Sequence, residues 1–242
     1  MSRGVPLGRR VVAEGVGTTL LLATVVGSGI MAERLSGGNV ALALLANSLA
    51  TGAGLVGLIL TFGGVSGAHF NPAVTVAEAS QGGVAWRDVG PYVAAQLFGA
   101  YAGVALAHAM FELPLFTTST HVRSGFGQLA GELTATFGLV CVVRGCSRTR
   151  SSFTPFAVAA YITAAYWFTS STSFANPAVT LARAASNTFA GIRPADAPGF
   201  IAAQALGATG ATLMFGWLLP SAPAAVGGAE TAGPGHDEEN AA

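Results

Sequence analysis

The chain has 242 residues, of which 52% are hydrophobic and 9% are charged, and its formal net charge is zero. A soluble domain carries about a quarter charged residues, so this composition excludes an ordinary soluble protein. The balanced charge offers no general attraction to nucleic acid, and we expect no such partner. The composition therefore predicts a protein embedded in a lipid bilayer.

Six apolar segments are long enough to cross about 30 Å of hydrocarbon as helices. They are residues 11–31, 40–63, 89–111, 129–143, 153–169 and 198–219, of which the fourth and fifth look short. With this topology, seven of the eleven arginines fall on the side of the two termini and four on the other side. The positive-inside rule then predicts that both termini are cytoplasmic.

The tripeptide Asn-Pro-Ala occurs twice, as Asn71-Pro72-Ala73 and as Asn176-Pro177-Ala178, each time within an apolar stretch. Asn is a favoured helix cap, and Pro is favoured at the first helical position. Each motif therefore predicts a helix that begins inside the membrane. About ten residues follow before a break, which gives a helix of about 15 Å, half the bilayer.

The two halves of the chain repeat the same order of features. Glu14, the first motif and Gln96 correspond to Glu132, the second motif and Gln204. Three spans per half is an odd number, so the repeats must have opposite orientations in the membrane. The sequence predicts an all-α membrane protein of six transmembrane helices and two re-entrant half-helices. We expect its parts to be a cytoplasmic N-terminus (1–10), a first repeat (11–111), a connecting loop (112–127), a second repeat (128–219) and a disordered cytoplasmic tail (220–242).

Two half-helices of opposite orientation would meet with their N-termini at the middle of the membrane. Irregular backbone at that depth is tolerated where it lines a water-filled path or is buried in protein. Each helix N-terminus adds roughly half a positive charge, which repels cations and interrupts proton transfer. We expect Asn71 and Asn176 to donate hydrogen bonds to a passing oxygen at a pore centre that also contains Pro72, Ala73, Pro177 and Ala178.

Glu14 and Glu132 are predicted to lie at mid-helix depth, where a charge costs roughly 2.5–3.5 kcal/mol. They hold the amides of the re-entrant loops, or they relay protons in a coupled transporter. Their symmetry-related positions favour the structural role. His69 packs within its loop or acts as a ligand or titrating gate, and packing is favoured. No catalytic or metal-binding spacing is visible, so we expect no enzyme activity, metal or cofactor.

With these residues in place, residues 12–219 resemble the major intrinsic protein family, the aquaporins and aquaglyceroporins. The stretch Ser66-Gly-Ala-His-Phe-Asn-Pro-Ala-Val-Thr75 is similar to the first signature of the family. The resemblance implies a homotetramer in which each protomer has its own pore for small uncharged solutes. It also implies a ladder of pore-lining carbonyls, from Gly67, Ala68, His69 and Phe70 and from Thr172, Ser173, Phe174 and Ala175.

The chain departs from the family at Val179, because family members generally carry Arg directly after the second motif. The family's outer filter, carried over by spacing, would consist of Thr51, Ala164, Ser173 and Val179. A shift of one residue would replace Ala164 with Thr163 or Ala165. All four side chains are small and uncharged, which predicts a wide filter without a cation. Whether Arg183, one helical turn beyond Val179, reaches the pore is left open.

The resemblance implies a passive channel for water and glycerol-like polyols. Val179 is similar to a replacement in a bacterial subgroup associated with arsenic-resistance genes, which suggests arsenous acid as a further solute. The location implied is the inner membrane of a bacterium. The alternative is an ion-coupled secondary transporter, since such proteins also use inverted repeats and broken helices. That alternative needs ionisable groups along the path, for which only Glu14, Glu132 and His69 qualify.

Overall fold

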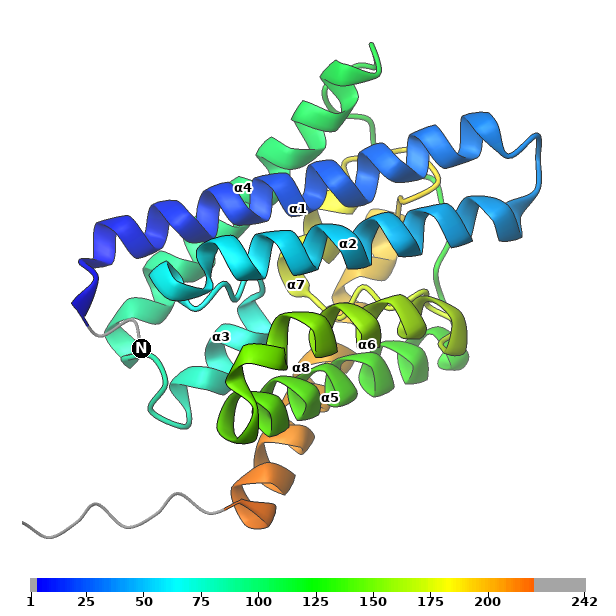
Figure 1. Cartoon of the computed structure of the whole chain (residues 1–242). Coiled ribbons are helices and arrows are strands. Elements are labelled where there is room, and N and C mark those ends of the chain that lie inside the picture. The colour runs from blue at the N-terminus through cyan, green and yellow to red at the C-terminus, as the bar shows by residue number, and fades with distance from the viewer. Residues whose placement is uncertain (1–3, 220–242) are drawn as a thin grey trace, which may run out of the picture.

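The computed structural model describes residues 4–219, and within them every regular element is a helix (Figure 1). The predicted tail lies outside the described residues. The elements are α1 (Leu7–Leu35), α2 (Val40–Ser66), α3 (Pro72–Ala79), α4 (Trp86–Met110), α5 (Phe126–Thr149), α6 (Thr154–Phe168), α7 (Pro177–Arg183) and α8 (Ala197–Leu218), with short 3-10 turns at Ser151–Phe153 and Pro194–Asp196. The predicted fold class is confirmed.

Five of the described helices are long and apolar enough to cross a membrane: α1, α2, α4, α5 and the segment Pro194–Leu218 that contains α8. Helix α6 has 15 residues and so rises about 22 Å, less than a full crossing. The sequence prediction ended the fourth span at residue 143, whereas α5 continues to Thr149. It continues because Arg144 is buried and pairs with Glu78 of α3.

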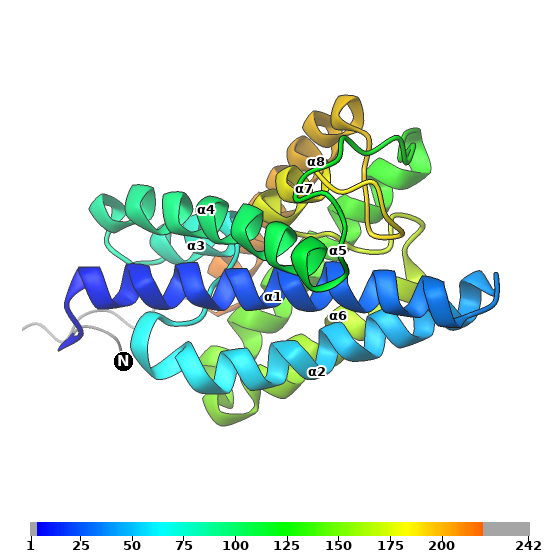
Figure 2. The same cartoon turned by 90° about the horizontal axis from the view of Figure 1, so that it is seen from above.

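The two halves of the chain pack in the same way. Helix α1 contacts α2 and α4, and α5 makes the equivalent contacts with α6 and α8. Figure 2 shows α1 flanked by α2 on one side and by α4 on the other. The halves meet where α2 packs against α6 and where α3 contacts α7. The short helices α3 and α7 each lie against α4 and α8.

Glycines allow the closest helix contacts within each half. A Cβ on Gly99 of α4 would overlap with the carbonyl of Gly15 on α1. A Cβ on Gly207 of α8 would overlap with the carbonyl of Leu133 on α5. Small residues of this kind let membrane helices approach backbone to backbone. The matching pairs bring α4 and α8 close enough for Gln96 and Gln204 to reach Glu14 and Glu132.

Glu14 holds the re-entrant loop that precedes α3. One carboxylate oxygen accepts hydrogen bonds from the Ser66 hydroxyl (2.6 Å) and the His69 N–H (2.9 Å). The other accepts from the Phe70 N–H (2.7 Å) and the Gln96 side-chain amide (2.8 Å). The Glu14 side chain is completely buried. Four donors around one carboxylate compensate for the cost of burying its charge.

Glu132 does the same for the loop that precedes α7. Its carboxylate accepts from the N–H groups of Phe174 and Ala175, both at 2.8 Å, and from the Gln204 amide at 2.6 Å. The two loops need such anchors because five non-glycine residues in them have a positive φ. These residues are Ala68, Phe70, Thr172, Ser173 and Ala175. Left-handed backbone at non-glycine residues costs about 1–3 kcal/mol each and persists only where surrounding contacts enforce it.

The glycine contacts predict different effects of one substitution at two sites. Gly99→Ala inserts a methyl group against the Gly15 backbone, and we expect a loss of about 1–3 kcal/mol of stability. Gly57→Ala is the control, because a Cβ at Gly57 on α2 meets no atom within 4 Å. Alanine favours a helix over glycine by about 1 kcal/mol, so Gly57→Ala should not destabilise. Thermal unfolding of the purified proteins in detergent measures both, and equal melting temperatures would contradict the prediction.

The carboxylate anchors predict a second pair of outcomes. Glu132→Gln keeps the side-chain volume but turns an acceptor oxygen into a donor that faces other donors. We expect a loss of about 2 kcal/mol or more, because buried N–H groups lose a charged acceptor. Glu33→Gln on the exposed end of α1 is the matched control and should leave the melting temperature unchanged. A Glu132→Gln protein as stable as the control would show that the loop does not depend on the charge.

Candidate functional site

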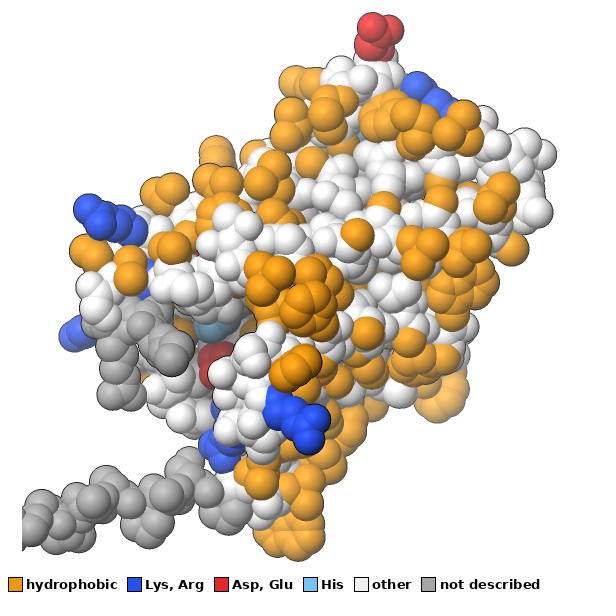
Figure 3. All heavy atoms as spheres, viewed as in Figure 1, with side chains coloured by type: hydrophobic (Ala, Val, Ile, Leu, Met, Phe, Trp, Pro, Cys, Tyr) orange, Lys and Arg blue, Asp and Glu red, His pale blue; other side chains and the backbone are white. Residues whose placement is uncertain are grey.

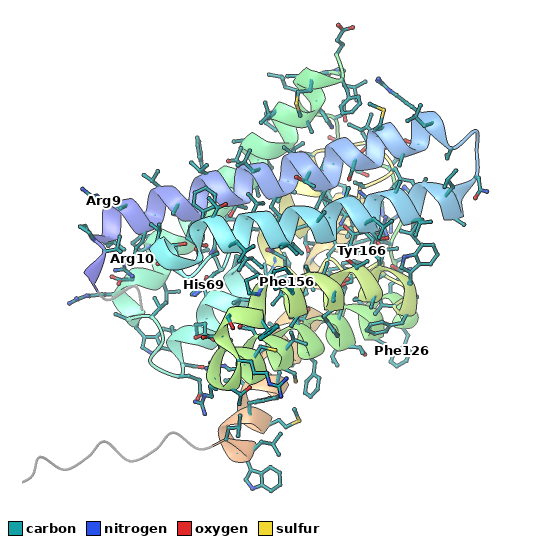
Figure 4. The ribbon with its side chains drawn as sticks, viewed as in Figure 1. Arg9, Arg10, His69, Phe126, Phe156 and Tyr166 are labelled. Atoms are coloured by element: carbon teal, nitrogen blue, oxygen red, sulfur yellow. The ribbon has the colours of Figure 1, made fainter. Side chains whose placement is uncertain are left out.

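A cavity of about 360 Å³ extends lengthwise between the two halves of the bundle. Its lining comes from α1, α2, α5 and α6 and from the two re-entrant segments. We call the end near the start of α1 the terminal mouth, lined by Glu78, Gly83, Val84, Ser147 and Thr154. We call the other end the distal mouth, lined by Thr51, Tyr166, Ser173, Phe174 and Arg183. Figure 4 shows His69 and Tyr166 toward these opposite ends.

Asn71 and Asn176 line the middle of the cavity. The side-chain oxygen of Asn71 caps α3 by accepting from Ala73 N–H (2.9 Å), and that of Asn176 caps α7 by accepting from Ala178 N–H (3.0 Å). Each side-chain amide also crosses to the opposite repeat. The Asn71 amide donates to the Ala175 carbonyl, and the Asn176 amide donates to the Phe70 carbonyl, both at 2.8 Å. One N–H of each amide therefore remains for another acceptor.

The other four residues predicted at the centre do not line this cavity. Pro72, Ala73 and Pro177 border a separate apolar hollow against α8, and Ala178 is fully buried. This part of the prediction is corrected: in the first turns of α3 and α7 it is Val74 and Val179 that line the cavity, and these four residues are outside its lining. Their contribution is to start α3 and α7 at the right depth.

Most residues predicted to present their backbone carbonyls to the pore lie in the cavity lining. Seven of them are in its lining: Gly67, Ala68, His69, Phe70, Ser173, Phe174 and Ala175; Thr172 is not. The lining also includes the apolar side chains of Leu21, Val25, Leu55, Ile59, Leu139, Val158 and Ile162. The lining therefore combines the residues of the two re-entrant segments with hydrocarbon side chains of the long helices.

At the distal mouth, Thr51, Ser173 and Val179 line the cavity, but Ala164 does not. Ala164 lies on the exposed face of α6, so its assignment to the filter is wrong. Tyr166 is in the lining instead, and its hydroxyl is 3.2 Å from the Thr51 hydroxyl. The side chains of α6 that reach the cavity are spaced by four residues, at Thr154, Val158, Ile162 and Tyr166. This spacing places all four, Tyr166 included, on one face of the helix.

Arg183 also lines the distal mouth, which contradicts the prediction of a filter without a cation. Its guanidinium lies over the ring of Phe174, with Cζ 3.4 Å from the ring centroid. Its Nε donates to the Ala190 carbonyl, and its terminal nitrogens bond to no described residue. Val179 and Arg183 lie one turn apart on the same face of α7. The small Val179 leaves room for the longer side chain to enter the mouth.

The loop that connects the repeats is tied down over the distal mouth. The Arg123 N–H donates to Asp196 (2.8 Å), and the Arg193 N–H donates to the His121 carbonyl (2.7 Å). The Arg123 side chain donates to the carbonyls of Gly191 and Ser171. Burial, assisted by Arg123 and Arg183, lowers the pKa of His121. Sequence reasoning treated this segment as a simple connection, and no spacing pattern marks its contacts.

Polar side chains lie at the terminal mouth. In Figure 3, acidic and histidine side-chain atoms lie at the floor of a hollow on this side of the molecule. Nδ1 of His69 is 3.1 Å from the Thr75 hydroxyl, so the ring packs against α3. Within residues 4–219, no three His, Cys, Asp or Glu side chains are grouped as a metal site requires.

Comparisons with known proteins identify a family and relatives of this chain. The sequence model of the family described as Major intrinsic protein matches residues 1–167. The chain is 55% identical to the aquaglyceroporin AqpS of Rhizobium meliloti over 216 residues, 89% of this chain and 92% of that protein. It is 34% identical to aquaporin NIP2-3 of Zea mays over 194 residues, 77% of this chain and 63% of that protein.

A solved structure gives the same result for the fold. The aquaglyceroporin from Plasmodium falciparum superposes with a TM-score of 0.67, covering 87% of this chain and 96% of that one, at 21% identity. At that identity the likeness concerns the fold alone. Together with the sequence matches, it leads to one conclusion: the chain belongs to the major intrinsic protein family and is a membrane channel, not an enzyme.

Proposed function

We propose that this protein is a passive channel for water and small neutral polyols such as glycerol, and that it also conducts arsenous acid. The observation that carries the proposal is the lengthwise cavity, which is lined by Asn71, Asn176, residues of the two re-entrant loops and apolar side chains. In the proposed mechanism, the loop carbonyls give a solute a track of hydrogen-bond acceptors. The names of its relatives, which include an aquaglyceroporin at 55% identity, support polyols as solutes.

The two anchoring glutamates support a passive mechanism. A coupled carrier needs ionisable groups that change partners during transport. Glu14 and Glu132 are outside the cavity lining, and each is already held by three or more donors. Releasing either carboxylate would cost the loop its anchor. This architecture therefore suits a fixed pore better than a carrier that alternates between two conformations.

The distal mouth supports selection for neutral hydroxylated solutes. Arg183 supplies hydrogen-bond donors and a positive charge, which oppose cations together with the helix N-termini at the centre. The hydroxyl of Ser173 is buried and has no partner among the described residues. Val179 adds width without charge. Arsenous acid fits these features because it is a neutral trihydroxide near pH 7, similar in its hydrogen bonding to a polyol.

We also propose that the channel is a homotetramer in the inner membrane of a bacterium, with both termini in the cytoplasm. The five long apolar helices and the shorter α6 make six helices that run along the bundle. An even number of such helices brings the two termini to the same side. The excess of arginines on that side supports the cytoplasmic assignment. The exposed apolar side chains of α2 and α6 suit contact with lipid or with neighbouring protomers.

Stopped-flow measurements on proteoliposomes test the proposed function. We expect flux of water, glycerol and arsenous acid above that of empty liposomes, unchanged by a proton or sodium gradient. Uphill accumulation of a solute driven by either gradient would support a coupled transporter instead. Flux of water alone would remove the polyol and arsenous acid parts of the proposal.

Arg183→Leu tests the revised filter. Loss of the guanidinium should raise cation leakage and raise the permeability of glycerol relative to water, because the mouth becomes wider and loses its charge. We expect a change of about threefold or more, the size of one ordinary net hydrogen bond. Arg87→Leu is the control, since the Arg87 side chain is 89% exposed outside the cavity. If Arg183→Leu and Arg87→Leu match the wild type in both measurements, Arg183 is not part of the filter.

A further inference from the structure

The carboxylate of Glu78 lines the terminal mouth without a hydrogen-bond donor. Oxygen Oε1 is buried and accepts no hydrogen bond, and no N–H or O–H group of the described residues donates to Oε2. Arg144 forms an ion pair with Glu78, but its Nη1 is 3.6 Å from Oε1, beyond hydrogen-bond distance. The ion pair offsets the charge of the carboxylate and leaves its hydrogen-bond acceptor sites to another molecule.

The surrounding backbone fixes Glu78 in this position. Arg144 donates to the carbonyl of Ala77, which ties the end of α3 to α5. The Gly83 N–H donates to the Glu78 carbonyl at 2.9 Å, so the chain folds back directly after the helix. A Cβ on Gly83 would come within 2.5 Å of Oε2, and glycine leaves that space to the carboxylate. The side chain is therefore placed at the mouth by its neighbours.

A second unpaired polar group lies at the same mouth. The hydroxyl oxygen of Thr154, at the start of α6, is buried and has no partner among the described residues. It lines the same cavity as Glu78, as does Ser147 near the end of α5. A carboxylate accepts hydrogen bonds only, whereas a hydroxyl both donates and accepts. Together they match a ligand that carries several hydroxyl groups.

We propose that Glu78 and Thr154 form a binding subsite for neutral polyhydroxylated solutes at the terminal mouth. A solute hydroxyl donates to the Glu78 carboxylate, and a second hydroxyl exchanges a hydrogen bond with Thr154. Arg144 balances the charge of Glu78, so the pair has no net charge to attract a cation. The subsite rests on the proposed channel function and adds a point of selection before the solute reaches the asparagines.

Three variants test this subsite. Glu78→Gln removes the charge but keeps the volume, and Thr154→Val removes the hydroxyl without touching Arg144. Glu33→Gln is the control on an exposed part of α1. In proteoliposomes we expect the glycerol-to-water permeability ratio to fall about threefold or more in Glu78→Gln, and by a smaller factor in Thr154→Val. Water permeability should stay at the wild-type value.

Infrared difference spectra of the purified protein, with and without glycerol, measure binding without transport. We expect a shift of a carboxylate stretching band in the wild type and in Glu33→Gln that is absent in Glu78→Gln. Glycerol flux without this band shift would overturn the subsite and leave the channel intact. The band shift without glycerol flux would support the subsite and overturn the polyol channel. Equal loss of water and glycerol flux in both mouth variants would indicate a constriction and overturn the subsite.

Discussion

The hydrogen bonds from loop amides to two buried carboxylates are the constraint on which this architecture depends. Without Glu14 and Glu132, the loops before α3 and α7 would leave several N–H groups unpaired in the membrane interior. The same carboxylates accept hydrogen bonds from the side-chain amides of Gln96 and Gln204, which links the loops to α4 and α8. A bilayer offers no water to satisfy these groups. The carbonyls of the loops are thereby directed toward the cavity, and the asparagines are held at its middle.

Much of this could be read from the sequence, because the informative residues act locally or in duplicate. A capping asparagine and its proline define a helix start within three residues. Glu14 and Glu132 stand out because an acidic residue in an apolar span demands an explanation, and two at corresponding positions demand the same one. The repeat order then required opposite orientations, from which the meeting of α3 and α7 followed.

What the sequence did not show depends on helix rotation and side-chain reach. Ala164 was chosen by counting from the second motif, whereas the rotation of α6 turns Tyr166 to the cavity. The reach of Arg183 stayed open because it follows Val179 by a full turn, but a long side chain that lies over Phe174 covers that distance. The predicted fourth span ended at residue 143, whereas a partner on α3 allows Arg144 to be buried within a longer α5. These contacts depend on how side chains meet after folding, which the order of residues does not show.

The exchange of amides between the asparagines has a consequence for how such a chain could arise. Asn71 bonds to the loop of the second repeat, and Asn176 bonds to the loop of the first in the same way. A reciprocal contact of this kind is what a two-fold symmetric dimer makes with itself. If a single half were inserted in both orientations, two such halves could pair and form both asparagine hydrogen bonds. Fusion of two copies of the gene would have preserved that interface and then allowed each half to diverge. Arg183 and Glu78 illustrate such divergence, because each is present in one half only.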